Sequence, residues 1–427
     1  MPNAFSKEEV VFFEQVIEGF DPNNITARQV SKFKPPSTEF ERSALTVHRP
    51  TPYIPVGGEG LVVSTFSDRT QLTVPSTLNA NDSAPSDIKN VPFNMNAVEL
   101  NDPKQRDRIA QGAVQQLSAT VDRIIATQVA KRGSLFIKNG APITSYEHVA
   151  QAEEAMSIRD VPLTAARTLI MNPIDYNSIS AGLANRDAPP NGVSLTAFER
   201  SMIPTVATFD SFKANFMPTQ AATTATGYLV NGANQDHDPV ATDVNGNNVD
   251  NRVQNLIVDT GSNAVNEGDA FTIAGVFAVS HIHKNVTPNL QVFRVTSVAG
   301  AAGSQTIQIT PAIVVDGGGG GAQANTDYAN CSSIPADNAA LTFLNVTDDR
   351  PSNIFFVNEA VEIIHGSLAT MDLEAGGVGT MSMSTDSGIE ILFAKQSSIN
   401  NLKTDYRLTM WMAGNVLVPE MCGNLIQ

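Results

Sequence analysis

Cysteine and aromatic residues are scarce in this chain of 427 residues. It has two cysteines, Cys331 and Cys422, and neither has a metal-binding partner at short spacing. This pattern favours two free thiols in a reducing compartment over a disulfide. Phe, Trp and Tyr make up 6% of the residues, with a single Trp, so a surface for stacking bases or sugars is not expected.

Positive charge is also in short supply. The chain has 27 Lys and Arg residues and 43 Asp and Glu residues, which gives a formal net charge of −16. This balance argues against sequence-specific nucleic-acid binding and against adhesion to an anionic membrane, because both need clustered Lys and Arg. A partner that presents a basic segment fits the charge better.

Long apolar runs are missing. No uninterrupted apolar stretch approaches the ~20 residues that span a bilayer. The first residues, MPNAFSKEEVVFFEQ, show no basic region followed by an apolar core, as a secretion signal would. We therefore expect a soluble, cytoplasmic protein with no membrane partner.

Catalytic motifs are missing as well. The glycine run at 317–321 lacks the Gly-Lys-Ser/Thr ending of a phosphate-binding loop, and no Gly-x-Ser-x-Gly or His-Glu-x-x-His sequence occurs. His281 and His283 would share one face of a strand, but two imidazoles without a nearby carboxylate or thiol make a poor metal site. These motifs give no positive support to an active site or a cofactor.

One polar loop partly matches a calcium-binding loop. It begins at Asp243 and reaches Asp250, but Gly246 stands at its fourth position rather than its sixth, and Gln254 replaces the glutamate of the twelfth position. A polar loop without a metal is the favoured interpretation.

The composition changes sharply along the chain. Residues 222–345 hold 13 of the 29 glycines, and ten acidic residues against three basic ones. Short apolar runs between turns predict a small β-barrel or sandwich, with strands at 228–230, 253–258, 270–273, 276–279, 291–298 and 306–309. Because the flanks mix helical patterns with strands, we expect an all-β module inserted into a host domain, where such modules usually contact other proteins.

The first 35 residues predict an arm. Ser6-Lys7-Glu8-Glu9 is a capping-box pattern, and apolar residues at helical spacing follow it until Asp21-Pro22. A second short helix is expected at 25–33, before Pro35-Pro36. Two short helices joined to the rest by a proline break indicate an arm rather than a core element.

The longest helical pattern covers 101–132. Apolar residues recur at helical spacing from Ile109 to Val129, and Gly133 ends the pattern. Some 30 residues would form a rod of about 45 Å. Basic residues crowd its start, where the helix dipole disfavours them, and both a solvated face and contact with an acidic neighbour stay open. The basic residues are Lys104, Arg106 and Arg108.

Further elements are expected elsewhere in the host. Helices are predicted at 145–158 and from 173 onward, and residues 181–221 are expected to be rich in loops. Residues 67–95 form a long polar stretch that fits a β-hairpin with a flexible tip. The predicted host strands cover 46–55, 60–66, 134–137, 168–171, 354–357, 389–393 and 406–412.

Short segments in similar order and spacing, from the arm to about residue 420, resemble one family. This family is the major coat proteins of short-tailed lambdoid phages of the Salmonella-infecting podovirus type. No single motif is specific, so the collinear set carries the resemblance. The segments are Phe33-Lys34-Pro35-Pro36, Glu41-Arg42-Ser43, Arg132-Gly133-Ser134-Leu135, Asn172-Pro173-Ile174-Asp175-Tyr176, Val249-Asp250-Asn251-Arg252, Gly268-Asp269, Ala274-Gly275-Val276, Lys284-Asn285-Val286 and Arg294-Val295.

The resemblance implies an α+β fold of the Hong Kong 97 coat type. In its terms, residues 1–35 are an N-terminal arm, and residues 36–139 are the E-loop and peripheral domain with a spine helix at 101–132. Residues 140–221 and 346–427 form the axial domain. Residues 222–345 resemble the family's I-domain, a β-barrel that aids folding and joins neighbouring capsomers.

Two sets of contact residues come with the resemblance. Acidic residues of the family's arm receive a basic helical hairpin of a scaffolding protein, and Glu14 and Glu18 stand at the similar positions, with Glu8 and Glu9 nearby. A polar loop of the I-domain reaches across a two-fold axis. Residues 236–250 resemble it, which makes inter-capsomer candidates of Asp243, Asp250, Arg252 and Arg294.

The resemblance predicts a structural, non-catalytic capsid protein. Hexamers and pentamers would close an icosahedral shell around phage DNA, with a scaffolding protein and a portal protein as partners and no cofactor. Assembly would take place in the bacterial cytoplasm. The sequence leaves open the triangulation number and whether a decoration protein binds. The alternatives are an enzyme, such as a hydrolase with a β accessory domain, and a binding or adhesion module.

Overall fold

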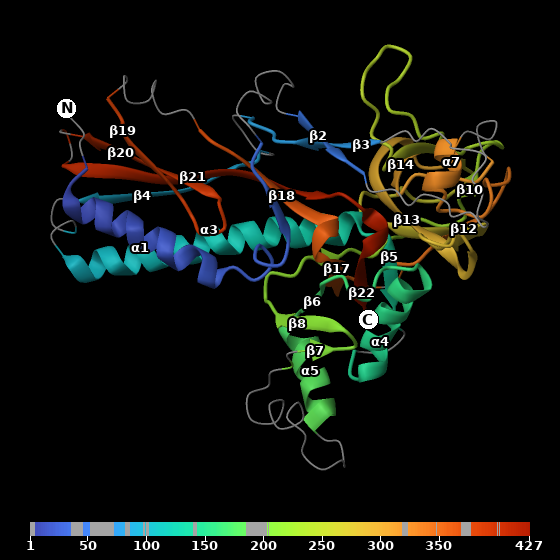
Figure 1. Cartoon of the computed structure of the whole chain (residues 1–427), viewed down its shortest axis with the longest axis horizontal. Coiled ribbons are helices and arrows are strands. Elements are labelled where there is room, and N and C mark those ends of the chain that lie inside the picture. The colour runs from blue at the N-terminus through green and yellow to red at the C-terminus, as the bar shows by residue number, and fades with distance from the viewer. Residues whose placement is uncertain are drawn as a thin grey trace, which may run out of the picture. The chain divides into compact units, whose positions relative to one another are not determined.

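The chain folds into two compact units that both mix helices and strands, so the predicted α+β class is confirmed (Figure 1). The first unit comprises Met1–Val47, Ser76–Ala126 and Glu362–Asn415, and the second comprises His48–Pro75, Thr127–Val361 and Val416–Gln427. The computed structural model describes residues 5–35, 46–51, 72–81, 86–96, 99, 102–139, 143–184, 203, 205–317, 323–346, 348–368, 377–398, 400 and 402–427. None of the helices in these ranges is long and apolar enough to cross a membrane.

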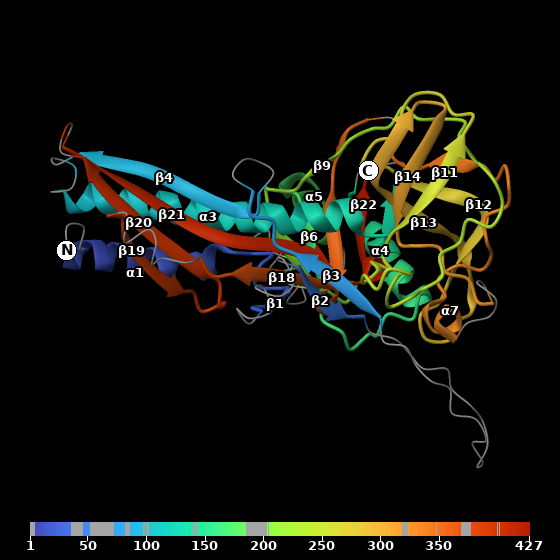
Figure 2. The same ribbon diagram turned by 90° about the horizontal axis from the view of Figure 1, so that it is seen from above.

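The first unit is built on a six-stranded sheet of order β1-β18-β21-β20-β19, in which β4 also pairs with β21 (Figure 2). Its strands are β1 (Ser31–Phe33), β4 (Ile88–Asn96), β18 (Val361–Gly366), β19 (Gly379–Ser384), β20 (Glu390–Ser398) and β21 (Lys403–Val416). The polar stretch 67–95 contains β3 (Thr73–Thr77), which pairs with β2 (Thr46–Pro50), and all but the last residue of β4. The strand predicted at 60–66 lies outside the described residues.

Helix α1 (Lys7–Asn23) packs on this sheet. The predicted capping box is present, since the Ser6 side chain accepts from the Glu9 N–H and the Glu9 side chain accepts from the Ser6 N–H. Phe12, Phe13, Val16 and Phe20 are buried. Aromatic rings of α1 and the sheet are in contact, and the ring centres of Phe13 and of Phe393 in β20 lie 5.3 Å apart. The predicted arm is therefore not detached, because one face of α1 is buried against the sheet of the first unit.

The prediction of a second short helix at 25–33 is wrong, because this segment forms a turn followed by β1. Asp122 accepts hydrogen bonds from the N–H groups of Ile25, Thr26 and Ala27 at 2.9, 2.9 and 3.1 Å. The Asp122 carboxylate thus satisfies the backbone donors of this turn. The backbone then continues into β1, which pairs in parallel with β18. Tertiary contacts have overridden a weak local helical preference.

Helix α3 (Pro103–Arg132) confirms the longest predicted helix. Its buried stripe follows the predicted period and includes Val114, Leu117, Val121, Ile125 and Val129. The helix stops at Gly133, where a Cβ atom would lie 2.9 Å from the backbone of Cys422 and Gly423. Glycine is therefore required where the chain turns past β22 (Cys422–Ile426).

The host part of the second unit is a six-stranded sheet of order β5-β22-β17-β6-β8-β7. The remaining strands are β5 (Leu135–Lys138), β6 (Arg167–Met171), β7 (Thr205–Val206), β8 (Phe209–Lys213) and β17 (Asn353–Val357). Two predicted helices are present, α4 (Tyr146–Ile158) and α5 (Pro173–Ala184), and Asn172 caps α5 through the N–H groups of Ile174 and Asp175. Sequence reasoning missed β7, β8, β18, β19 and β22.

The inserted segment forms a closed β-barrel. Its sheet has the order β10-β11-β14-β13-β12-β15. A bridge between Leu229 and Ala340 and a hydrogen bond from the Leu341 N–H to the Tyr228 carbonyl join its two ends. Its strands are β10 (Leu229–Val230), β11 (Gln254–Asp259), β12 (Ala270–Val279), β13 (Val286–Ala301), β14 (Ser304–Thr310) and β15 (Leu341–Phe343). Closure leaves no long open edge, which protects a β-domain from wrong pairing.

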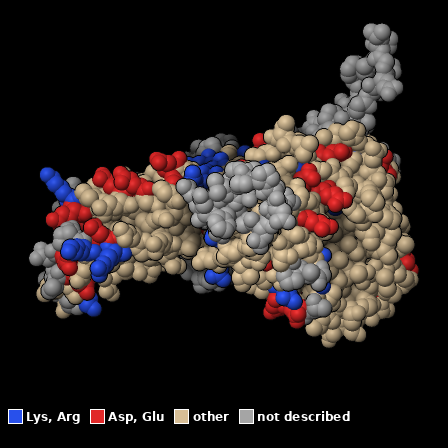
Figure 3. Space-filling view, turned by 90° about the horizontal axis from the view of Figure 1, so that it is seen from below, with Lys and Arg blue, Asp and Glu red and all other residues tan. Residues whose placement is uncertain are grey.

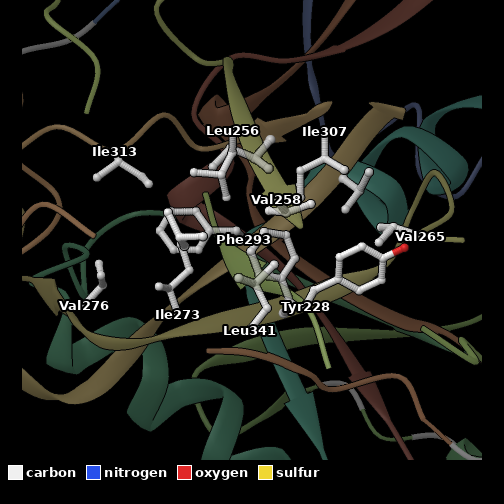
Figure 4. Packing of buried hydrophobic residues seen from close by; sticks show 14 of the residues in the cluster. Tyr228, Leu256, Val258, Val265, Ile273, Val276, Phe293, Ile307, Ile313 and Leu341 are labelled. Atoms are coloured by element: carbon white, nitrogen blue, oxygen red, sulfur yellow. The ribbon is translucent and has the colours of Figure 1, made fainter. Parts of the chain in front are cut away.

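Apolar side chains from all sides of the barrel fill its interior (Figure 4). Tyr228, Leu256, Phe293 and Ile307 are each fully buried. The two strands predicted at 270–273 and 276–279 are one strand, β12, whose pairing is irregular between Thr272 and Phe277. A short helix, α7 (Gln323–Tyr328), follows β14.

Candidate functional sites of the arm and the insertion

The acidic residues Glu14 and Glu18 lie one turn apart on the exposed side of α1. Neither carboxylate forms an ion pair or a hydrogen bond with a residue that the structure describes. Glu8 is exposed nearer the start of the helix. Figure 3 views the side toward which α1 and α3 lie in Figure 1, and both acidic and basic side chains lie on this surface. The exposed carboxylates of Glu14 and Glu18 are therefore available to basic groups of a partner.

Glu9 differs from these neighbours because its carboxylate is already engaged. It accepts hydrogen bonds from Lys395 Nζ at 2.6 Å and from the Tyr406 hydroxyl at 2.7 Å, and its side chain is 12% exposed. Burial raises the pKa of Glu9, but the bonds from Lys395, Ser6 and Tyr406 outweigh this effect and hold the pKa below its usual value. Glu9 fastens α1 to the sheet and is not an open contact site.

Replacing Glu9 should reveal this attachment through its pH dependence. We expect Glu9→Gln to lower the free energy of unfolding by about 1–2 kcal/mol at pH 7, since a largely buried charged pair is lost. A carboxyl with a lowered folded-state pKa stabilises above its unfolded pKa, and this contribution is lost as the pH falls. Urea unfolding should therefore show the difference from wild type shrinking as the pH falls below the usual range of a carboxyl pKa.

The exposed Glu14→Gln variant is the matched control and should change stability by less than about 0.5 kcal/mol at any of these pH values. A Glu9→Gln effect that stays constant with pH would contradict the assignment.

The loop at 236–250 stands clear of the barrel strands (Figure 1). At its tip Asp243 accepts hydrogen bonds from the N–H groups of Asn245 and Asn247, both at 2.8 Å, and Gly246 has a φ of +79°. The bonds from Asn247 and Asn245 hold the pKa of Asp243 below its usual value. Val244 beside it is fully exposed. The tip is thus an ordered turn that presents one carboxylate and one apolar side chain.

The metal ligands that the sequence offered, in the polar loop and at His281 and His283, do not come together in the part of the chain that the structure describes. Within the described residues, no group of three or more His, Cys, Asp and Glu side chains lies close enough to hold a metal ion. His281 and His283 lie in a turn rather than on a strand face, and the His283 ring contacts Asp160 at 3.0 Å. The strand geometry expected for this pair is therefore wrong.

Arg252 and Asp250 form a pair that points inward. The guanidinium donates hydrogen bonds from Nε and Nη2 to the Asp250 carboxylate, both at 2.9 Å. It also donates from Nη1 to the Val416 carbonyl at 2.7 Å and from Nη2 to the Pro75 carbonyl at 3.0 Å. Burial raises the pKa of Asp250, but the bonds and charge of Arg252 hold it below its usual value. These contacts engage Arg252 within its own subunit, and the inter-capsomer contact expected of Arg252 and Asp250 stays a prediction.

Arg294 is also turned inward and is fully buried. Its Nη2 donates hydrogen bonds to the Ala130 carbonyl at 2.5 Å and to Gln220 Oε1 at 2.8 Å. The guanidinium carbon lies 5.0 Å from the centre of the Phe136 ring. A cation at the last turn of α3 is favoured by the helix dipole. Burial lowers its pKa to about 9, so it is charged at neutral pH. Arg294 joins the barrel to the end of α3, and its role as a counterpart for a neighbouring loop stays a prediction.

Sequence reasoning missed a polar network where the chain enters and leaves the insertion. β9 (Thr219–Gln220) and β16 (Arg350–Pro351) pair with each other there. Asp269 is buried and accepts from the Thr223 hydroxyl, the Asn266 N–H and Asn345 Nδ2, each at 2.9 Å. The composition change near 222 and 346 marked this junction, but no sequence pattern could show which distant side chains meet.

A comparison with family models matches residues 1–426 to "P22 coat protein - gene protein 5". The chain belongs to the P22 coat protein family. It is a structural major capsid protein of the phage virion, with the family's Hong Kong 97 type coat fold, and its copies assemble into an icosahedral shell. The resemblance from short collinear segments is thereby confirmed.

Solved structures similar to this coat protein include phage coats. The CUS-3 coat protein I-domain is 39% identical and covers 29% of this chain and 99% of its own, with a TM-score of 0.23. A structure of Mycobacterium phage Che8 is 10% identical over 94% of this chain and 90% of its own, with a TM-score of 0.44. The capsid structure of the cyanophage P-SCSP1u is 12% identical over 97% and 87%, with a TM-score of 0.42.

Proposed function

We propose that this coat protein assembles in the bacterial cytoplasm with a scaffolding protein, and that it has no catalytic activity. The match to the coat family along nearly its full length is the observation that carries the proposal. A portal protein would occupy one vertex, and the interior contact with DNA would not depend on base sequence.

The acidic face of α1 is the proposed scaffold-binding site. Glu14 and Glu18 are exposed and spaced for contact with one helical turn of lysines, and Glu8 extends the same charge. Each exposed pair contributes well under ~1 kcal/mol, and salt screens it. Weak contacts of this kind suit a partner that must bind in large numbers and later leave.

The loop tip at Asp243 is the proposed contact of the insertion with a neighbouring capsomer. It is ordered, exposed and free of an ion pair with any described residue. We further propose the division of the chain into an arm (1–35), an E-loop and peripheral domain (36–139), an axial domain (140–221 and 346–427) and the inserted domain (222–345).

Co-expression with the scaffolding protein tests this function. We expect particles of hundreds of subunits in sedimentation and closed shells in negative-stain microscopy. A chain that stays a small oligomer and turns over an ester or glycoside substrate would favour the hydrolase alternative. A small species that binds a cell-surface ligand would favour the adhesion alternative.

Assembly should depend on ionic strength. Each subunit carries a formal charge of −16, so copies repel one another at low salt, while added salt also weakens the scaffold contacts. We expect the initial assembly rate, followed by light scattering, to change several-fold between about 20 and 200 mM salt. Superimposable traces over this range would contradict a role of charge in assembly.

A further inference from the structure

A groove of about 470 Å³ lies between α1 and α3 in the first unit. The two helices come close at Gly19, where a Cβ atom would lie 3.4 Å from the Val114 side chain. Gly19, Ala110 and Val114 give the groove a small, largely apolar floor, and the last two are buried. Its rim is polar and includes Glu18 of α1 and Asp107 of α3.

We infer that this groove seats one lysine or arginine side chain of the basic partner, with Glu18 and Asp107 holding its charged end. The inference rests on the proposed scaffold contact and extends it from a charged helix face to a site between two helices. Asp107 belongs to no motif and was not expected to take part.

The charges of the groove support this occupant. Glu18 and Asp107 are the two charged residues of its described lining, both are exposed, and neither forms an ion pair with a described residue. They come from different helices and border one groove, so a cation seated in it could contact a carboxylate from each helix. No basic side chain of the described lining neutralises them.

The shape of the groove also fits. A lysine or arginine has a three- or four-carbon stem that can cover apolar surface while its charged end stays at a polar rim. The floor offers the stem apolar contact, and the carboxylates accept charge-assisted hydrogen bonds from the end. The amides of Gln111 and Gln115 at the rim can accept the remaining N–H groups of a guanidinium.

Binding of the full-length coat protein to purified scaffolding protein tests the site. We expect Asp107→Asn and Glu18→Gln each to raise the dissociation constant about fivefold at low salt, as for a partly desolvated charge pair. Because both carboxylates would hold one cation, the double variant should be weaker by clearly less than the product of the two effects. Glu147→Gln, which removes an exposed carboxylate from α4, should leave the constant unchanged.

A second variant separates the groove from general attraction. Gln115→Arg places the chain's own guanidinium at the groove and should weaken binding about tenfold by occupying it. If Glu14→Gln and Glu18→Gln weaken binding but Asp107→Asn and Gln115→Arg do not, the groove is excluded and the proposed scaffold contact survives. If none of the four variants changes binding, the proposed contact on α1 fails as well.

Discussion

Replacing Arg294 with methionine should lower the free energy of unfolding by about 3 kcal/mol. The change removes hydrogen bonds to the Ala130 carbonyl and to Gln220 from a fully buried position. It also removes a cation that interacts electrostatically with the buried Asp269 carboxylate and the charge at the last turn of α3. We expect urea unfolding to show the loss, and amide exchange to show faster opening of β13 and of the end of α3.

Lys131→Met is the matched control because it removes a cation from the same helix end at the surface. Lys131 is 47% exposed and pairs with Glu267, which is 56% exposed, so the expected change is less than about 1 kcal/mol. Buried charged groups replaced together by neutral ones often cost little. The double variant Arg294→Met/Asp269→Asn should therefore be more stable than the sum of the single changes predicts. Strict additivity would show that the two charges do not interact.

The burial of Arg294 could not be predicted from the sequence. A charged residue beside polar loops is usually exposed, and the family resemblance suggested a counterpart for a loop of another subunit. Its position among apolar residues of β13 is compatible with either face of a strand. Only the tertiary structure, in which β13 passes the end of α3, decides that the side chain enters the interior. The same limit applies to Arg252 and to Asp269.

The elements with strong local signals were predicted well. The apolar period of α3 and the capping box of α1 each fix a helix without help from distant residues. The β-rich insertion was visible because its composition differs from that of the host. Strands such as β4 and β22 were missed because their residues are held by pairing with distant segments: β4 pairs with β21, and β22 pairs with β5 and β17.

Glu14 and Glu9 of α1 show the same limit of prediction from the sequence. Spacing along a helix predicts which residues share a face, and the exposure of Glu14 and Glu18 agrees with that expectation. Glu9 carries the same charge one turn earlier, but Lys395 and Tyr406 of the sheet approach it from nearly 400 residues away in sequence. A helix position alone could not separate a carboxylate that binds a partner from one that holds the helix in place.

The second large effect is expected at Asp122, which holds the turn after α1. Asp122→Ala would leave the N–H groups of Ile25, Thr26 and Ala27 without their acceptor, two of them on buried residues. Unpaired buried donors cost about 1–3 kcal/mol each, so we expect a loss of about 3–5 kcal/mol in urea unfolding. Trypsin cleavage after the exposed Arg28 should accelerate as the turn opens. Asp107→Ala removes an exposed aspartate from the same helix and should change neither measurement appreciably.

The pH dependence distinguishes a buried carboxyl from a simple packing contact. Burial raises the pKa of Asp122 to about 6 against the lowering effect of the three backbone bonds. The folded chain therefore binds this proton more tightly than the unfolded chain, and the contribution of Asp122 to stability falls as the pH rises from about 4 to 6. The destabilisation caused by Asp122→Ala should be about 1 kcal/mol larger at pH 5 than at pH 7. A larger effect at pH 7 would mean that the three N–H donors outweigh burial and that the carboxylate is held as a charged cap of the turn.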